Sequence, residues 1–423
     1  MTPRPRNRRS QIVAAAGPLF HKLGYQQVSM AQIAADVGIT AAALYRHFPG
    51  KQQVLAAVIA EYFTRLQNAD TDIGVDTADP AGVDLDSGVG LRATIRRLAA
   101  VALERREAPL LWAREYGRVA VPDRVDLRTQ LTKVVLAMAG GVLDSRVGLS
   151  AAGAEILAWR AVAVLTSPSY HRTELPRPRF ENTLTDMTMA VLALTPPTIG
   201  ADDVAAVGRP VPATIDRLSR REALLSAALR LFAERGYHGV TVDDIGAAVG
   251  IAGPSVYNHF PGKSEFLRTL LNRGGEGLQL SMSQVLAHAT DPAAALADLL
   301  QTYASFAWDH SHLVTVLVSE AHNLPEDDYR QTRQGQREYL AEWYHLLRLA
   351  VPGMDDAEAR VRVHASITVI NHLARSKRAK LIPPLRTHVV SSALATLGLP
   401  GLPGLAQATP WISDVGAMRS SPR

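Results

Sequence analysis

The strongest constraint on the fold of this chain is an internal repeat. Residues 8–59 align with residues 220–271 without a gap, at an offset of 212, and 21 of the 52 aligned positions are identical. The densest match pairs the run YRHFPGK at 45–51 with YNHFPGK at 257–263. Because self-similarity at one long spacing is typical of a duplicated structural unit, the sequence predicts two units of one fold in tandem.

A fainter similarity continues beyond the repeat at an offset of 205, where Glu115 aligns with Glu320. The first half therefore has seven extra residues, which we place in the Asp- and Gly-rich stretch Asp70–Gly90, predicted to be a loop. A Pro- and Gly-rich linker over Thr195–Thr214 joins the halves. The predicted domains are a first head (7–60), a first helical regulatory body (61–198), the linker (199–215), a second head (216–272), a second helical body (273–400) and a disordered tail (401–423).

Each head has the pattern of three short helices. In the first head, apolar residues at three- and four-residue spacing predict a helix over 12–23, and Ser29 is placed to cap a second helix. Gly38 supplies the turn geometry that other residues adopt at a cost, and Thr40 precedes a third helix over 41–47. A helix pair joined by a glycine turn is the helix-turn-helix pattern, whose last helix enters the major groove of DNA.

The residues of the third helix suit that position. Small side chains at its start allow close approach to base edges and to thymine methyl groups, and the polar residues after them can donate hydrogen bonds to phosphates. Arg4 and Arg6 form a basic arm that either reaches a minor groove or is simply a solvated tail. The predicted DNA-contacting residues of the first head are Ser29, Thr40, Ala41, Ala42, Ala43, Tyr45, Arg46, His47 and Lys51.

The second head repeats the pattern with less positive charge. Residues 1–52 have a net charge of +6, whereas residues 212–264 have a net charge of +1, so the phosphate contribution to DNA affinity is expected to be weaker there. We expect Ile245 and Val249 to be buried. The predicted DNA-contacting residues are Thr241, which caps, Gly253, Pro254 and Ser255 at the helix start, and Tyr257, Asn258, His259 and Lys263.

These two motifs, with Phe20, Gly24-Tyr25 and Val37-Gly38-Ile39 before the first of them, resemble the N-terminal signature of TetR/AcrR-family transcriptional regulators. The resemblance implies an all-α fold, dimerisation through the last two helices of each body, and release of operator DNA when a ligand enters the body. The fusion of two units is similar to certain actinobacterial tandem repressors of lipid-uptake operons.

The fusion changes what the resemblance implies about assembly. We expect the helices near 154–167 and 180–194 to pack on those near 359–373 and 385–399, which makes one chain an intramolecular pseudo-dimer. The alternative is a homodimer of the chain with four heads. Two unlike heads predict an asymmetric double-stranded DNA operator. In a second hypothesis only the first head binds DNA, and the second unit serves as a docking or ligand-sensing module.

Aromatic residues of the bodies are candidates for an effector pocket. Trp112, Tyr116, Trp159, Tyr303 and Trp343 lie in amphipathic helical stretches, where an aromatic side chain is more often part of the core. The resemblance implies a small hydrophobic effector, such as a fatty acyl or steroid-like compound. His310 and His312 point apart on a helix, so we expect no metal.

Other classes of protein find no support in the sequence. The chain has no cysteine, no apolar run of membrane-spanning length and no phosphate-binding, nucleophile-elbow or dinucleotide motif, and we expect no signal peptide. A purely structural helical protein would account for the amphipathic stripes but not for the repeated motif. We therefore expect a cytoplasmic DNA-binding regulator that is not an enzyme, has no cofactor and has no membrane partner.

Overall fold

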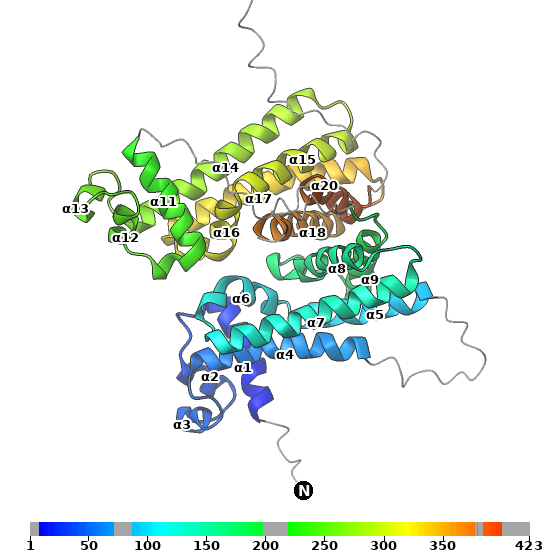
Figure 1. Ribbon diagram of the computed structural model, residues 1–423, viewed down its shortest axis with the longest axis horizontal. Coiled ribbons are helices and arrows are strands. Elements are labelled where there is room, and N and C mark those ends of the chain that lie inside the picture. Colours follow the sequence, from blue (N-terminus) through cyan, green and yellow to red (C-terminus); the bar gives the residue numbers. More distant parts are fainter. Residues whose placement is uncertain (1–7, 72–86, 198–218, 377–378, 380–383, 400–423) are drawn as a thin grey trace, which may run out of the picture.

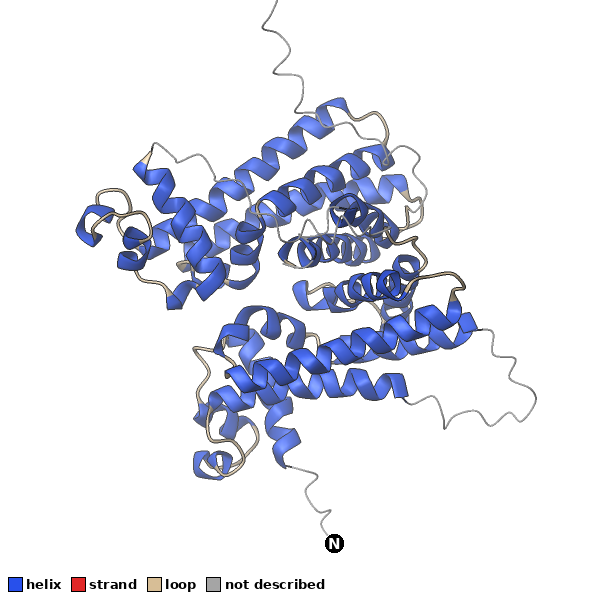
Figure 2. Cartoon of the chain, in the orientation of Figure 1, coloured by secondary structure: helices blue, strands red, loops and turns tan. Residues whose placement is uncertain are grey.

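The computed structural model describes residues 8–71, 87–197, 219–376, 379 and 384–399. Within these ranges every regular element is a helix, which confirms the all-α fold class (Figure 2). None of the described helices is long and apolar enough to cross a membrane. The basic arm with Arg4 and Arg6, the linker at 199–215 and the tail at 401–423 lie outside the described residues.

The first half is a three-helix head on a helical body (Figure 1). The head consists of α1 (Arg8–Leu23), α2 (Met30–Asp36) and α3 (Ala41–Tyr45). The body consists of α4 (Lys51–Thr71), α5 (Ser87–Glu104), α6 (Glu107–Glu115), η1 (Tyr116–Arg118), α7 (Val121–Ser145), α8 (Ala151–Thr166), η2 (Ser167–Tyr170) and α9 (Arg177–Leu192).

The described α-helices of the second half follow the same order. Its head consists of α11 (Arg220–Arg235), η4 (Tyr237–Gly239), α12 (Val242–Ala247) and α13 (Gly253–Val256). Its body consists of α14 (Lys263–His288), α15 (Pro292–Asp309), α16 (Ser311–Ser319), η5 (Ala321–Asn323), α17 (Glu326–Ala350), α18 (Asp356–Arg375) and α20 (Pro384–Leu397).

The helix boundaries reproduce the two offsets of the repeat. The helices α4 and α14 begin at Lys51 and Lys263, an offset of 212, whereas α5 and α15 begin at Ser87 and Pro292, an offset of 205. The seven extra residues of the first half therefore lie between α4 and α5. The predicted loop Asp70–Gly90 was too long at both ends, because α4 runs to Thr71 and α5 already begins at Ser87.

The long helices α4 and α14 connect each head to its body without a break. The predicted boundaries after residues 60 and 272 both fall inside these continuous helices. A second connection is made by α6, which packs on α1. Gly17 of α1 allows this approach, because a Cβ atom there would lie 2.8 Å from the Glu107 carboxylate. Each head is thus held by two helices of its body, a geometry that can transmit movement of the body to the head.

The two halves pack on each other through their last helices. The helix α8 contacts α18, and α9 contacts α20, so that the bodies meet while both heads lie on the left of the view in Figure 1. Arg179 on α9 forms ion pairs with Asp355 and with Glu358, the latter at 2.8 Å. The Trp159 indole stacks on the His372 imidazole, with centroids 6.1 Å apart. The pairing of last helices expected from the resemblance is therefore present within one chain.

Candidate nucleic-acid interface and effector cavity

The helix α3 presents small and polar side chains to the outside of the first head. Its N-cap is Thr40, whose hydroxyl oxygen accepts a hydrogen bond from the Ala43 amide at 3.2 Å, as the sequence predicted. Leu44 is fully buried and fixes the helix on the head, whereas the Tyr45 side chain is 52% exposed. Ala42, Arg46 and His47 are also exposed, while Ala41 and Ala43 are half-buried. The helix is shorter than expected, since Arg46 is already its C-cap.

Ser29 holds the start of the preceding helix. Its hydroxyl oxygen accepts from the Gln32 amide, and the Gln32 side-chain oxygen accepts from the Ser29 amide at 2.7 Å, which forms a capping box. Thr241 and Asp244 repeat this arrangement in the second head, where the bonds from Thr241 lower the pKa of Asp244. The capping predicted for Ser29 and Thr241 is confirmed, and their contacts with DNA stay predictions.

Lys51 has a structural role that the sequence did not reveal. Its ammonium group donates to the carbonyl oxygens of Tyr25, Gln26 and Val28, at 2.7, 3.3 and 2.8 Å, and lies 4.4 Å from the centroid of the Tyr25 ring. An ammonium group has three hydrogens, so all of its donors are used within the head. In the second head Lys263 donates to Tyr237 and Val240. The repeated lysine therefore joins the start of the long helix to the loop after the first helix.

Arg9 is a further residue of this kind and was not singled out from the sequence. Its guanidinium group donates to the His47 carbonyl oxygen at 3.1 Å and lies 4.2 Å from the centroid of the buried Phe48 ring. Arg221 lies over Phe260 in the same way, at 4.6 Å. The available signal was the identity of Arg9 and Arg221 in the repeat. Part of the repeated motif thus specifies the fold of the head.

The third helix of the second head, α13, is one of the main differences between the heads. Val256 is buried, whereas Pro254, Ser255 and Asn258 are exposed and Tyr257 is 55% exposed. His259 and Gly253 are half-buried, and so is Val249, which we had expected to be buried. The helix itself is short and ends at Val256.

An acidic side chain lies against the start of α13. A Cβ atom at Gly253 would be 1.9 Å from the Asp243 carboxylate, so glycine is the residue that fits beside it. The corresponding residues in the first head are Ala31 and Ala41, which carry no charge. DNA phosphates approaching α13 would therefore meet a carboxylate that is absent from α3.

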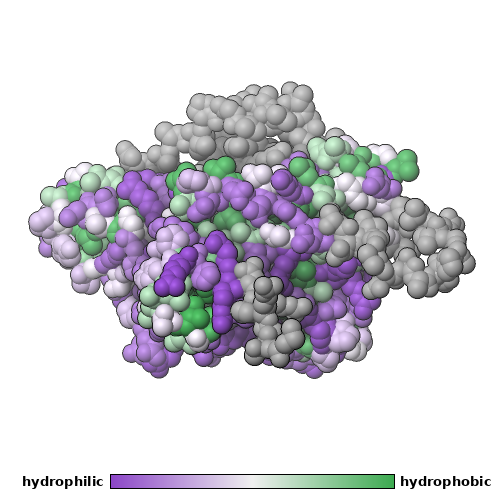
Figure 3. All heavy atoms as spheres, turned by 90° about the horizontal axis from the view of Figure 1, so that it is seen from below, coloured by the Kyte–Doolittle hydropathy of each residue, from purple (hydrophilic) through white to green (hydrophobic). Residues whose placement is uncertain are grey.

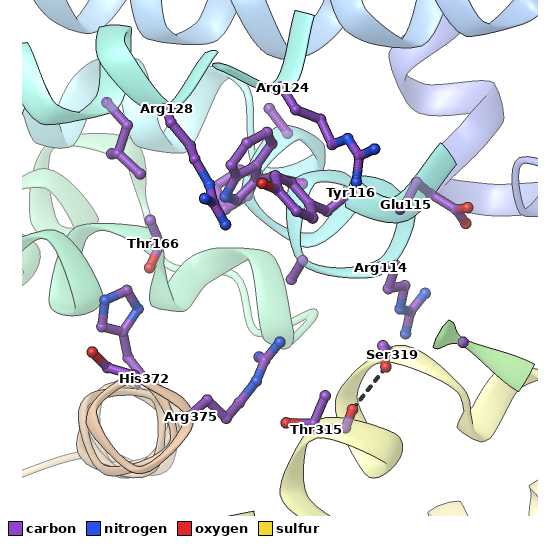
Figure 4. A pocket seen from close by; sticks show the side chains of 18 of the residues that line it. Arg114, Glu115, Tyr116, Arg124, Arg128, Thr166, Thr315, Ser319, His372 and Arg375 are labelled. Carbon is purple, nitrogen blue, oxygen red and sulfur yellow. Dashed lines mark hydrogen bonds between the residues drawn. The ribbon is translucent and has the colours of Figure 1, made fainter. Parts of the chain in front are cut away.

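A cavity of about 1300 Å³ lies between the two halves. Its apolar wall comes from the first body, where the Trp112 ring packs edge-on against Phe63 and Tyr116, with centroids 5.8 and 4.6 Å apart. Trp159 also lines the cavity, so three of the five predicted effector residues surround it. The second half contributes residues of α16 and α18, including Thr315, His372 and Arg375 (Figure 4).

Arginine side chains dominate the polar part of this cavity. Arg124 and Arg128 of α7 lie over the Tyr116 ring, at 5.4 and 4.9 Å from its centroid (Figure 4). Arg114 donates across the boundary between the halves to the Val318 carbonyl oxygen at 3.2 Å. Burial raises the pKa of Glu115, which is ion-paired with Arg118. The cavity therefore combines an aromatic wall with an excess of cations, since six arginines and three glutamates line it.

Tyr303 and Trp343 do not line this cavity. They are packed in the core of the second body, where their rings meet edge-on at 6.1 Å and are 5% and 0% exposed. The Tyr303 hydroxyl group donates to Asn371. Both residues therefore belong to the core, which was the alternative to a pocket for aromatic residues at helical spacing.

Figure 3 shows the molecule from the side of the first half. Hydrophilic residues predominate over the coloured surface, and apolar residues gather only in small, separate patches. Large exposed apolar patches are typical of protein-protein or membrane contacts. The polar character of this face is compatible with a polar partner such as nucleic acid.

Taken with their exposed third helices, the two heads define a protein with two helix-turn-helix units on helical bodies. Both heads match the family described as "Bacterial regulatory proteins, tetR family", at residues 12–58 and 224–270. The chain therefore contains two regions in tandem that each match this family.

Several characterised regulators are similar to part of the chain. The HTH-type transcriptional repressor KstR2 of Mycolicibacterium smegmatis is 33% identical over 138 residues, which are 31% of this chain and 65% of the repressor. KstR2 of Rhodococcus jostii is 29% identical over 143 residues, covering 34% and 70%. The solved structure of KstR2 from Mycobacterium tuberculosis aligns with 40% of this chain and 95% of its own, with a TM-score of 0.34 and 22% identity. The chain thus spans about two thirds of the length of these repressors.

Proposed function

We propose that this chain is a ligand-responsive transcriptional repressor with two non-identical DNA-binding heads, acting in the cytoplasm. The observation that carries the proposal is the exposed helix α3, which presents Ala42, Tyr45 and Arg46 while Leu44 anchors it to the head. Both heads match the tetR family, and the similar KstR2 proteins are named as repressors. The partner is a double-stranded DNA operator.

The two heads bind unlike sequences, so the operator is asymmetric. The first head has Ala42 and Ala43 at the start of its third helix, whereas the second has Pro254 and Ser255 at the aligned positions. Since the side chains that face base edges differ, the bases preferred by each head differ as well. A palindromic site has two identical half-sites. One head would find its preferred sequence there, and the other head would be mismatched.

Footprinting of the purified chain on its own upstream DNA tests this function. We expect one protected region with two unlike half-sites. The variant Tyr45→Ala/Arg46→Ala should lose the first half-site, and Tyr257→Ala/Asn258→Ala should lose the second. These pairs avoid Lys51 and Lys263, which hold the fold of the heads. Absence of any protected region on its upstream DNA, with intact helical structure, would contradict the proposal.

A second candidate function is favoured by the acidic residue beside α13. In this alternative only the first head binds DNA, and Asp243 together with the near-neutral charge of the second head keeps α13 away from phosphates. The second unit then serves as a docking or ligand-sensing module. If Tyr257→Ala/Asn258→Ala leaves affinity and footprint unchanged, this alternative replaces the two-headed one.

The effector is a small hydrophobic compound of the fatty acyl or steroid-like kind. Support comes from the aromatic wall of the cavity, where Phe63, Trp112 and Trp159 offer apolar surface. A volume of about 1300 Å³ exceeds that of a typical drug-sized pocket, ~300–1,000 Å³. Release of operator DNA on addition of such a compound, measured by gel shift, is the expected response.

One chain acts as a pseudo-dimer. The contacts of α8 with α18 and of α9 with α20 support this assembly. These are the last helices of each body, through which the TetR/AcrR resemblance implies that two subunits pair. Light scattering should give a mass near 45.6 kDa. A mass twice as large would favour the homodimer with four heads.

A further inference from the structure

The interiors of the two bodies differ in side-chain size at three aligned positions. Tyr303, Tyr339 and Trp343 occupy the positions that Leu98, Val134 and Met138 hold in the first body, at the offset of 205. Leu98 and Val134 line the cavity. The three aromatic side chains of the second body are 5%, 8% and 0% exposed and pack on one another, and the smaller Leu98, Val134 and Met138 are buried as well, at 1%, 5% and 3%. Larger side chains thus fill the interior of the second body.

The chemistry of the cavity selects for an anion with an apolar body. Arg124 and Arg128 face it from α7, and neither guanidinium forms an ion pair with a carboxylate in the described part of the chain. Such groups match carboxylate, phosphate or sulfonate oxygens. The rings of Phe63 and Trp112, which pack edge-on against each other, also line the cavity and provide apolar contact.

The cavity also reaches the supports of both heads. In the first half, Glu115 is ion-paired with Arg118 at 2.5 Å, and Arg118 lies 5.5 Å from the centroid of the Tyr25 ring in the head. In the second half, the aligned Glu320 accepts a hydrogen bond from the amide of Tyr237, the residue aligned with Tyr25, at 3.0 Å. Glu115, Arg118, Glu320 and Tyr237 all line the cavity.

We propose that the chain has a single effector site, the cavity between the two halves, which takes an amphiphilic anion and acts on both heads through Glu115 and Glu320. The second body has lost its site to the aromatic residues Tyr303, Tyr339 and Trp343. This inference rests on the proposed function, because it describes how the regulator senses its ligand. One bound molecule changes the support of two unlike heads, since residues of both halves surround it.

Fluorescence titration with anilinonaphthalene sulfonate tests the site, because this probe joins an apolar aromatic body to one sulfonate. Phenylnaphthylamine has the same body without the charge. We expect one saturable sulfonate site per chain. The variant Arg124→Met/Arg128→Met should weaken binding of the sulfonate probe by about tenfold, equivalent to ~1.4 kcal/mol. Its affinity for phenylnaphthylamine should change by less than about twofold.

A second variant introduces the aromatic side chains of the second body into the first. Leu98→Tyr/Val134→Tyr should abolish binding of both probes, whereas Leu136→Tyr, an exposed position on the same helix α7, should leave it unchanged. Hydrogen exchange should show slowed or accelerated exchange in residues 24–28 and 236–240 of the wild type on probe binding, and no change in the filled variant. Circular dichroism confirms that each variant is folded.

The outcomes separate this inference from the proposed function. Two equivalent sites per chain, undiminished binding in Leu98→Tyr/Val134→Tyr, or a response confined to one head would each overturn the single shared site. Operator binding is measured separately by gel shift without probe, where Leu98→Tyr/Val134→Tyr should behave as the wild type. A wild-type chain that binds the probe once but binds no DNA would refute the proposed function alone.

Discussion

The imidazole rings of His171 and His364 stack across the boundary between the two halves, with centroids 4.7 Å apart and planes 25° apart. His171 follows η2 of the first half, and His364 lies on α18, where its Nε2 atom is 3.1 Å from the Tyr344 hydroxyl group. Burial lowers the pKa of His171 well below its usual value and that of His364 to about 4. The contact between the halves therefore depends on two uncharged rings.

This pair makes the stability of the protein sensitive to acid. A histidine of lowered pKa is neutral in the folded chain, whereas the unfolded chain takes up a proton near pH 6.5. Stability is thus fully present above about pH 6.5 and is lost as the pH falls towards 4. At pH 5 the loss is on the order of 2 kcal/mol for His364. Nearby Arg333 and Arg360 add to the effect, because they repel the protonated ring.

Urea unfolding at pH 7.5 and at pH 5 measures this loss. His364→Gln should reduce the difference between the two unfolding free energies. The exposed His345 lies on α17, and His345→Gln serves as the control that keeps the full difference. Equal differences in the two variants would show that the buried ring does not govern the acid response.

Replacement of Lys51 should destabilise the first head. Lys51→Met removes an ammonium group that donates to three carbonyl oxygens, and hydrogen bonds to charged groups contribute about 1.5–3 kcal/mol each. We expect a lower melting temperature and faster hydrogen exchange in residues 24–51. The exposed Lys22 donates no such bond within the described part of the chain, so Lys22→Met controls for the loss of one charge. Slower DNA binding without any change in exchange would instead assign Lys51 to phosphate contact.

Arg46 should contribute to DNA affinity through phosphates. It is exposed at the end of α3, and each phosphate neutralised by a protein cation releases counterions. Arg46→Ala should weaken binding to all DNA sequences and reduce the slope of log affinity against log salt by about one. Gel shifts across a salt series measure the slope. A loss confined to one operator sequence would mean that Arg46 contacts a base.

Removal of the carboxylate beside α13 should strengthen DNA binding by the second head. Asp243 lies against Gly253, where it repels approaching phosphates. Asp243→Ala should raise operator affinity by about threefold at low salt, with the gain lost at high salt as screening increases. Asp327→Ala removes an equal charge from the exposed start of α17 and should have little effect. Equal behaviour of the two variants would favour the hypothesis of one working head.

Local signals in the sequence predicted the heads well. Ser29, Thr40 and Thr241 cap their helices, and each side chain accepts a hydrogen bond from the amide three residues later. Such a bond needs no distant partner, so the local sequence is enough to predict it. The repeat also located the two halves, and its change of offset located the difference between them.

Tertiary contacts were not predictable in the same way. Trp159 and Trp343 are the same residue type in apolar helical stretches, yet one lines the cavity and the other is fully buried. Lys51 was assigned to phosphate because a lysine after a recognition helix has the right charge, but its carbonyl partners lie 23 to 26 residues away in the chain.

The contacts of α8 with α18 and of α9 with α20 also affect how the response depends on the number of molecules in a cell. Two separate subunits must meet before they can act, so their active population falls with the square of concentration when they are scarce. Here the partner surface is always attached to the same polypeptide, at an effective concentration that dilution does not change. Occupancy of a binding site should then rise in simple proportion to copy number. A gene controlled in this way would respond smoothly, without a threshold, to changes in expression of its regulator.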